Sequence, residues 1–293
     1  MRVWRWWWMW SVVVVTLGAQ VLAVDRSLRP LGTLDAAILP DGRGELTLAL
    51  GYVRNERFPY FTAPAALDRQ DRWHLPRVGF RAGAADWVEI EAEYETLYLD
   101  EKTARGETNW QYGSGDARLH TKVRVRGEDE LYPALAVRFG TKLPNANKDN
   151  RLGTDETDFD LLALVSKNFG PVRMHTNLGI SLLGNPGQLL GNRFGPGGQD
   201  DLFVYSMAVE SPAFGSQEEG SSELRLLGEI SGLAGSRFGN DRQRGTFGVH
   251  VSQGSFGFFA GASVGFDTAS EDFGLQLGAT YAWDLGKWVE KIQ

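Results

Sequence analysis

Apolar and charged residues alternate strictly along two neighbouring stretches of the chain. From Trp87 to Glu95, apolar residues alternate with four glutamates, and from Asp116 to Arg126 they alternate with histidine, lysine and arginine. A period of two is the signature of a β-strand with one apolar and one charged face. When both faces are aligned in an antiparallel pair, Glu95, Glu93, Glu91 and Glu89 lie opposite Arg118, His120, Lys122 and Arg124, respectively. The two stretches therefore predict a β-hairpin with a ladder of opposite charges.

The same alternation recurs along the rest of the chain, and no stretch shows a convincing helical period. Ten further strands are predicted at Glu45–Val53, His74–Ala82, Leu131–Leu143, Asp158–Phe169, Val172–Leu182, Asp201–Glu210, Ser222–Leu233, Thr246–Ser252, Phe256–Asp267 and Phe273–Trp283. With the hairpin, the expected number of strands is about twelve.

The connections between these strands alternate in length. Long ones at 54–73, 100–115, 144–157, 184–200 and 234–245 alternate with short ones at 83–86, 127–130, 170–171 and 253–255, and only 211–221 and 268–272 depart from the trend. An even number of strands with short turns at one end and long loops at the other is typical of an antiparallel transmembrane β-barrel of a Gram-negative outer membrane. Aromatic residues near strand ends fit interfacial girdles. The alternative is a soluble periplasmic β-sheet protein with a solvated charged face.

The amino terminus reads as a secretory signal peptide over residues 1–23. Arg2 and Arg5 precede an apolar stretch that ends at the small residue Ala23. An uncleaved anchor is the alternative, because the stretch from Trp6 to Val24 carries no charge. We expect a periplasmic lead without periodicity over residues 24–43, the barrel over 44–285 and a carboxy-terminal tail over 286–293.

Composition narrows the possible functions. The chain of 293 residues contains no cysteine, which excludes disulfides and thiolate metal sites. Its formal net charge of −7 argues against general nucleic-acid binding. Neither a cofactor nor a metal site is expected, and no catalytic residues are predicted.

Polar side chains on the charged faces are expected to line the barrel lumen. They are Glu89, Glu91, Glu93, Glu95, Arg118, His120, Lys122, Arg124, Arg138, Arg173, His175 and Asn177. We considered two kinds of site among such residues. His175, Asn177 and Ser181 share one strand face as in a hydrolase, but residues 175 and 181 are too far apart for direct contact at about 3.3 Å of rise per residue. The acidic residues from Asp155 to Asp160 lack the spacing of a calcium-binding loop.

One region resembles a known family. It comprises Gly140-Thr141-Lys142-Leu143-Pro144, a loop with Leu152-Gly153-Thr154, a strand ending Ser166-Lys167-Asn168-Phe169-Gly170, and then His175-Thr176-Asn177-Leu178-Gly179. This pattern is similar to that of outer-membrane β-barrels grouped as transporters associated with the MetA pathway of phenol degradation. The resemblance covers about forty residues and implies a barrel that passes small, aromatic or hydrophobic molecules. The chain departs from many such barrels in continuing from Gly286 to Gln293 beyond the aromatic residue Trp283.

These observations lead to one main expectation and three alternatives. The main expectation is a porin-like outer-membrane channel for small solutes, whose partners are outer-membrane lipid, the solute and, during biogenesis, the barrel-assembly machinery. The alternatives are a plugged or structural barrel without transport, an outer-membrane enzyme and the soluble periplasmic protein.

Overall fold

The structure, a computed structural model, describes residues 31–55, 67–103, 105–147, 149–184, 201–215, 222–235, 241–267 and 270–284. The predicted signal peptide and the tail over 286–293 lie outside these residues. Thirteen strands are formed: β1 (Arg43–Arg54), β2 (Leu67–Ala85), β3 (Val88–Thr103), β4 (Thr108–Ser114), β5 (Ala117–Arg126), β6 (Ala134–Leu143), β7 (Asp158–Phe169), β8 (Val172–Leu182), β9 (Asp201–Glu210), β10 (Glu223–Gly235), β11 (Arg242–Gln253), β12 (Phe256–Gly265) and β13 (Phe273–Asp284).

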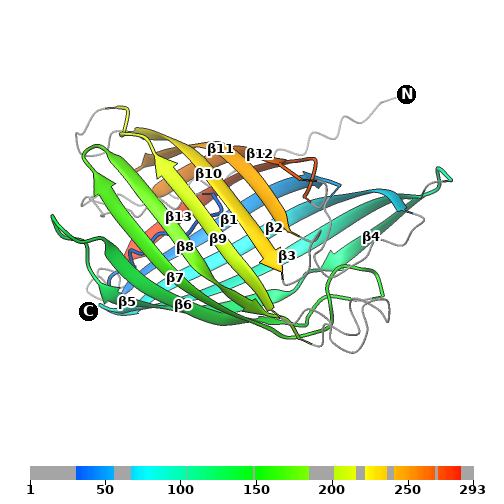
Figure 1. Ribbon diagram of the computed structural model, residues 1–293, viewed down its shortest axis with the longest axis horizontal. Coiled ribbons are helices and arrows are strands. Elements are labelled where there is room, and N and C mark those ends of the chain that lie inside the picture. Colours follow the sequence, from blue (N-terminus) through cyan, green and yellow to red (C-terminus); the bar gives the residue numbers. More distant parts are fainter. Residues whose placement is uncertain are drawn as a thin grey trace, which may run out of the picture.

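The strands form one closed antiparallel barrel (Figure 1). Apart from β4, each strand pairs with the strands next to it in the chain, and the pairing of β1 with β13 completes the ring. Twelve strands make up the ring, because β4 pairs only with the far part of β3 and continues into β5. The predicted fold class is therefore confirmed.

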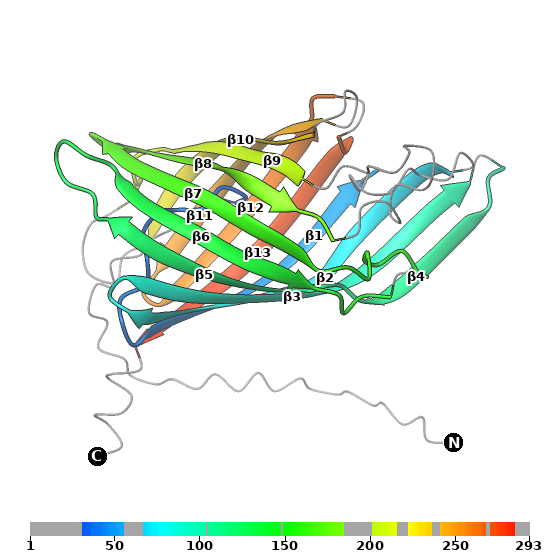
Figure 2. The same cartoon turned by 60° about the horizontal axis from the view of Figure 1, so that its bottom comes forward.

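Strands β2, β3 and β4 extend beyond the rest of the barrel, on the right in Figure 2. Thr96–Lys102 of β3 pairs with Thr108–Ser114 of β4. The expectation of a long loop over residues 100–115 is therefore wrong. The alternation in β4 is confined to Trp110 and Tyr112, which are both more than half exposed, and this pattern is too short to identify a strand from the sequence.

The register of the charged hairpin also differs from the prediction, by two residues. Glu89 lies opposite Lys122, and Glu93 lies opposite Arg118. A shift of two residues leaves every side chain on its predicted face, so the alternation alone does not exclude it. The chain leaves β4 at Gly115, whose N–H donates to the Glu95 carbonyl oxygen at 2.9 Å, and β5 begins two residues later.

Outward-facing positions carry exposed apolar side chains around the ring. On β1 and β13, for example, Leu48, Leu275 and Leu277 are each about half exposed. Aromatic rings gather at both ends: Tyr52 lies 4.5 Å from Trp73 at the long-loop end, and other aromatic rings pack together where β13 ends. A continuous apolar belt with aromatic residues at its edges is the surface that a β-barrel presents to lipid.

Candidate functional site

Residues 31–42, immediately before β1, lie inside the barrel, where Figure 2 shows them as a dark-blue coil enclosed by the strands. We call them the lumen segment. The segment enters next to β2, where Asp41 forms a parallel bridge with Gly83 and the Gly42 N–H donates to the Gly83 carbonyl oxygen at 3.3 Å. A β-carbon at residue 83 would lie 2.0 Å from the Pro40 carbonyl oxygen, so a glycine is required at this close approach. The sequence predicted a periplasmic lead over residues 24–43, whereas the described part of it occupies the lumen.

The carboxylate of Glu229 on β10 binds the start of the lumen segment. It accepts the N–H groups of Gly32 at 2.9 Å and Thr33 at 3.0 Å, and that of Leu31 as well. The Thr33 hydroxyl donates to the same carboxylate at 3.3 Å. Successive backbone N–H groups that converge on one carboxylate form a charge-assisted anchor.

Two further wall residues bind the backbone of the lumen segment. The amide of Asn177 on β8 accepts from the Leu34 N–H at 2.7 Å and donates to the Leu34 carbonyl oxygen at 2.9 Å. The carboxylate of Glu89 on β3 accepts the Leu39 N–H at 2.7 Å. The segment has no regular structure of its own, so wall side chains replace the ladder partners that a strand would supply.

Asp35 is the charged side chain that the lumen segment inserts among wall residues. Its carboxylate lies 3.2 Å from the Arg173 guanidinium and 3.7 Å from the His175 ring, and it is almost fully buried. His175 in turn contacts the Ser166 hydroxyl at 2.8 Å and the Glu210 carboxylate at 3.1 Å. Burial of these groups is offset by hydrogen bonds and ion pairs among them.

The hydrolase-like arrangement considered from the sequence is not assembled. His175 binds Ser166 and Glu210 on the neighbouring strands, while Asn177 binds the lumen segment. Ser166, His175 and Glu210 resemble a Ser–His–carboxylate arrangement, but the Ser166 hydroxyl also accepts the Ala36 N–H at 2.9 Å. In this structure the lumen segment therefore covers the hydroxyl that a substrate would have to reach.

The ladder glutamates contact basic side chains from three strands. Glu89 lies 3.0 Å from Lys122, and Glu91 lies 2.9 Å from Arg138. Glu89 also lies 3.6 Å from Arg81, and Glu91 lies 3.9 Å from Lys122. Glu93 lies 3.6 Å from Arg77 and 3.5 Å from Arg118, and Glu95 lies 2.7 Å from His74, 3.3 Å from Arg77 and 3.8 Å from Arg118. Arg77 and His74 on β2 were not among the expected lumen residues, because a bulge in the pairing between His74 and Arg77 breaks the alternation there.

Two other expected lumen residues, His120 and Arg124, contact groups outside this ladder. His120 contacts Asp160 at 3.3 Å on the far side of β6. Arg124 is exposed and donates to the Asp86 carbonyl oxygen at the short-turn end. The next arginine, Arg126, pairs with Asp129 in the turn after β5, where hydrogen bonds from the Tyr132 N–H and the Arg126 guanidinium lower the pKa of Asp129 below its usual range.

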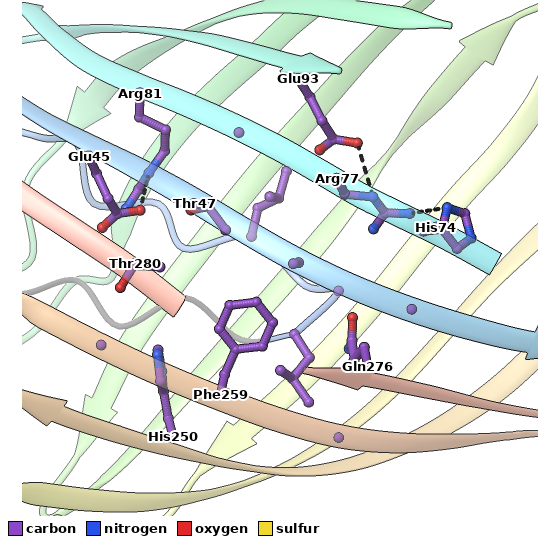
Figure 3. A pocket seen from close by; sticks show the side chains of 18 of the residues that line it. Glu45, Thr47, His74, Arg77, Arg81, Glu93, His250, Phe259, Gln276 and Thr280 are labelled. Carbon is purple, nitrogen blue, oxygen red and sulfur yellow. Dashed lines mark hydrogen bonds and ion pairs between the residues drawn. The ribbon is translucent and has the colours of Figure 1, made fainter. Parts of the chain in front are cut away.

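A cavity of about 430 Å³ remains beside the lumen segment, between it and the wall formed by β11, β12, β13, β1, β2 and β3, and His120 of β5 and Arg138 of β6 also line it. One side carries paired charges: Arg81 lies 2.6 Å from Glu45, and Arg77 lies beside Glu93 (Figure 3). The other side carries His250 and Phe259 with small and hydroxyl-bearing residues. Leu31 of the segment also lines the cavity.

Sequence reasoning did not single out Glu45, Arg81, Glu210, Glu229 or His250 as site residues. Each of them occupies an inward position in an alternating strand, so the alternation contains the signal. The alternation does not predict where the lumen segment lies. The position of this segment decides which of the many inward polar residues become its partners.

Among the described residues, no group of three or more histidine, aspartate or glutamate side chains is placed to hold a metal ion. Asp158, considered for a calcium loop, lies 2.7 Å from the Lys142 ammonium group. The described part of the chain also contains no helix that is long and apolar enough to cross a membrane.

The closed ring of twelve strands, the apolar belt and the polar lumen define the fold of an outer-membrane β-barrel. The COG4313 outer membrane channel from Pseudomonas putida F1 shares this fold, with a TM-score of 0.56 and 14% identity over 85% of this chain and 98% of that chain. The translocator domain of autotransporter NalP from Neisseria meningitidis aligns with a TM-score of 0.48 and 10% identity over 83% of this chain and 89% of that chain. The CymD monoaromatic hydrocarbon channel aligns with a TM-score of 0.40 and 8% identity over 84% and 89%. No family model and no curated protein matches the sequence.

Proposed function

We propose that the protein is an outer-membrane channel for small, uncharged solutes, and that the lumen segment narrows its path. The observation that carries this proposal is the cavity of about 430 Å³ that lies between the lumen segment and the wall formed by β11, β12, β13, β1, β2 and β3. Pockets that hold small molecules have volumes of about 300–1,000 Å³. Short turns at the end where the lumen segment enters support a periplasmic position for that end, because outer-membrane barrels carry their short turns on the periplasmic side.

The charge pairs support passage of uncharged solutes. Glu45, Glu91 and Glu93 on the cavity side each have a cationic partner within 4 Å. A solute ion would have to compete with these short contacts and lose its own hydration. A neutral solute meets no such penalty. The resemblance to transporters associated with the MetA pathway adds small aromatic molecules to the expected solutes.

A structural barrel without transport is the second candidate, and one observation favours it. The lumen segment crosses the lumen and is anchored at several points, from Glu229 on β10 to Glu89 on β3. If these anchors hold permanently, the barrel conducts little. The Ser166–His175–Glu210 network also supports anchoring rather than catalysis, because the Ser166 hydroxyl accepts a hydrogen bond from the Ala36 N–H of the lumen segment.

Single-channel recording in a planar bilayer separates the two candidates. The test variant is Glu229→Ala, which removes the acceptor of Leu31, Gly32 and Thr33. The control is Ile230→Ala, because this neighbouring side chain faces outward and is 56% exposed. If the protein is a channel, the native chain should conduct weakly and the Glu229→Ala variant should have a several-fold higher conductance. The Ile230→Ala variant should have the conductance of the native chain.

Hydrogen exchange of the Gly32 and Thr33 amides provides the structural readout for the same variants. Loss of hydrogen bonds to a charged group, at about 1.5–3 kcal/mol, should speed exchange about 10- to 160-fold in Glu229→Ala. If exchange accelerates but neither protein conducts, the structural barrel is the correct reading. Unchanged exchange would show that Glu229 does not anchor the segment.

A further inference from the structure

His250 on β11 is a buried side chain without a hydrogen-bond partner among the described residues. It is 4% exposed, its two ring nitrogens are both unpartnered, and the ring lines the cavity (Figure 3). A buried polar group left without a partner costs about 1–3 kcal/mol. His175, which is buried to a similar degree, has a partner for each nitrogen. His250 therefore offers one donor and one acceptor to a molecule that enters the cavity.

Phe259 on β12 stands beside this histidine. The two residues are directly paired across the strands, and their rings meet edge to face with centroids 6.0 Å apart. The Phe259 ring lies over Gly278 of β13, where a β-carbon would be 2.4 Å from its Cζ atom. The absence of a side chain at residue 278 thus allows the ring to lie against the wall. An aromatic ring held in this way presents a flat apolar surface to the cavity.

The wall on the β12 and β13 side of these two rings carries no charged side chains toward the lumen. The lumen-facing residues of β13 from Gly274 to Ala282 are glycine, glutamine, threonine and alanine, and those of β12 are glycine, serine and Phe259 itself. Thr280 and Gln276 border the cavity with their polar groups (Figure 3). On the other side of His250, Arg225 of β10 is its cross-strand partner, and this arginine lies 3.7 Å from both Glu210 and Glu223. Across the cavity, Arg81 and Glu45 pair with each other, so the charges around the two rings are already paired. This wall therefore favours an uncharged ligand.

We propose that His250 and Phe259 form a binding subsite for a neutral molecule with a flat apolar ring and a hydroxyl or carbonyl oxygen. The ring packs against Phe259 and the oxygen hydrogen-bonds to the His250 imidazole. This inference rests on the proposed channel function and identifies the class of solute that the cavity selects. It makes His250 a residue that determines specificity rather than one that merely fills the lumen.

The test uses the full chain in lipid nanodiscs, with histidine labelled at its ring Cε1 carbon and observed by NMR. The chain has four histidines, so a His250→Gln variant assigns the His250 signal. Benzyl alcohol is the probe, toluene lacks its oxygen, and benzoate carries a charge in place of the hydroxyl. We expect benzyl alcohol to shift the His250 signal saturably, toluene and benzoate to shift it little, and the His175 signal to stay in place as an internal control.

A Phe259→Leu variant tests the second half of the subsite. Edge-to-face and stacked aromatic pairs contribute about 0.5–1.5 kcal/mol, so its affinity for benzyl alcohol should fall about 2- to 12-fold. Thr246→Ser, on the same strand as His250, is the control and should keep the native affinity. Equal shifts with toluene, equal movement of the His175 signal, or no saturable shift in the native chain would each overturn the subsite. A protein that conducts without binding benzyl alcohol at His250 refutes this inference alone, whereas one that binds it but passes no solute refutes the channel.

Discussion

Glu89 and Lys122 face each other at 3.0 Å across β3 and β5, and both side chains are almost completely buried. The same glutamate accepts the Leu39 N–H of the lumen segment at 2.7 Å, while the lysine donates to the Asp35 carbonyl oxygen at 3.5 Å. One ion pair of the wall therefore holds the segment at two points. The charge ladder on the inner wall therefore helps to hold the lumen segment inside the barrel.

Removal of Lys122 should destabilise the barrel far more than removal of another ladder cation. Lys122→Met removes the ammonium group 3.0 Å from the buried Glu89 carboxylate and leaves the Arg81 guanidinium at 3.6 Å, which we expect to cost about 3 kcal/mol. The control is Arg118→Met, because the Arg118 side chain is 36% exposed and its contacts with Glu93 and Glu95 are long; its loss should cost less than about 1 kcal/mol. The measurement is the temperature at which the folded band disappears in a heat-modifiability gel. Equal shifts for the two variants would contradict a special role for the buried pair.

Arginine should be tolerated on one face of β13 and rejected on the other. Leu277 faces outward and is 56% exposed, whereas its neighbour Gln276 borders the cavity. Leu277→Arg places a charge in lipid, at a cost of about 2–4 kcal/mol near the middle of the bilayer. Gln276→Arg introduces the same side chain into an aqueous lumen. The yield of folded barrel after refolding into lipid vesicles compares the two, and similar yields would show that the assigned faces are wrong.

A side chain at Gly140 should prevent the pairing of β5 with β6. A β-carbon there would lie 2.2 Å from the Leu119 carbonyl oxygen and 2.4 Å from the His120 ring. Because the first of these contacts is with backbone, Gly140→Val requires a shift of the strand itself. Gly228→Val is the matched control, since nothing lies within 4 Å of a β-carbon at that position. Loss of folded protein for the control alone, or for neither variant, would contradict this packing.

The faces of the strands could be read from the sequence, because lipid and lumen impose opposite polarity on successive residues. The alternation around Val172–Leu182 and Phe273–Trp283 identifies the same strands as the structure does. The pairing of Glu89 with Lys122 could not be read in this way. The predicted partner, Arg124, lies on the same face two residues further on, so both registers satisfy the pattern.

The position of the lumen segment has no local signal. Leu31, Leu34 and Leu39 follow neither a helical nor a strand period, because each contacts a different part of the wall. Their backbone partners come from strands that are far away in sequence: Glu229 is 196 residues from Thr33, and Asn177 is 143 residues from Leu34. Only the closed ring brings these residues together, so the candidate site depends on tertiary structure that periodicity does not encode.

The β3–β4 hairpin ends in a turn that stands clear of the membrane-facing belt, at the far right in Figure 2. Gly106, with a φ of 84°, donates its N–H to the Thr103 carbonyl oxygen at 2.8 Å, and nothing lies within 4 Å of where its β-carbon would be. Gly106 and Glu107 are both exposed, so a short peptide epitope inserted between them would extend into solvent. In intact cells an antibody against that epitope would bind only if the hairpin points away from the cell. The β3–β4 hairpin, which the sequence pattern did not predict, thus provides a site for measuring which end of the barrel faces the outside of the cell.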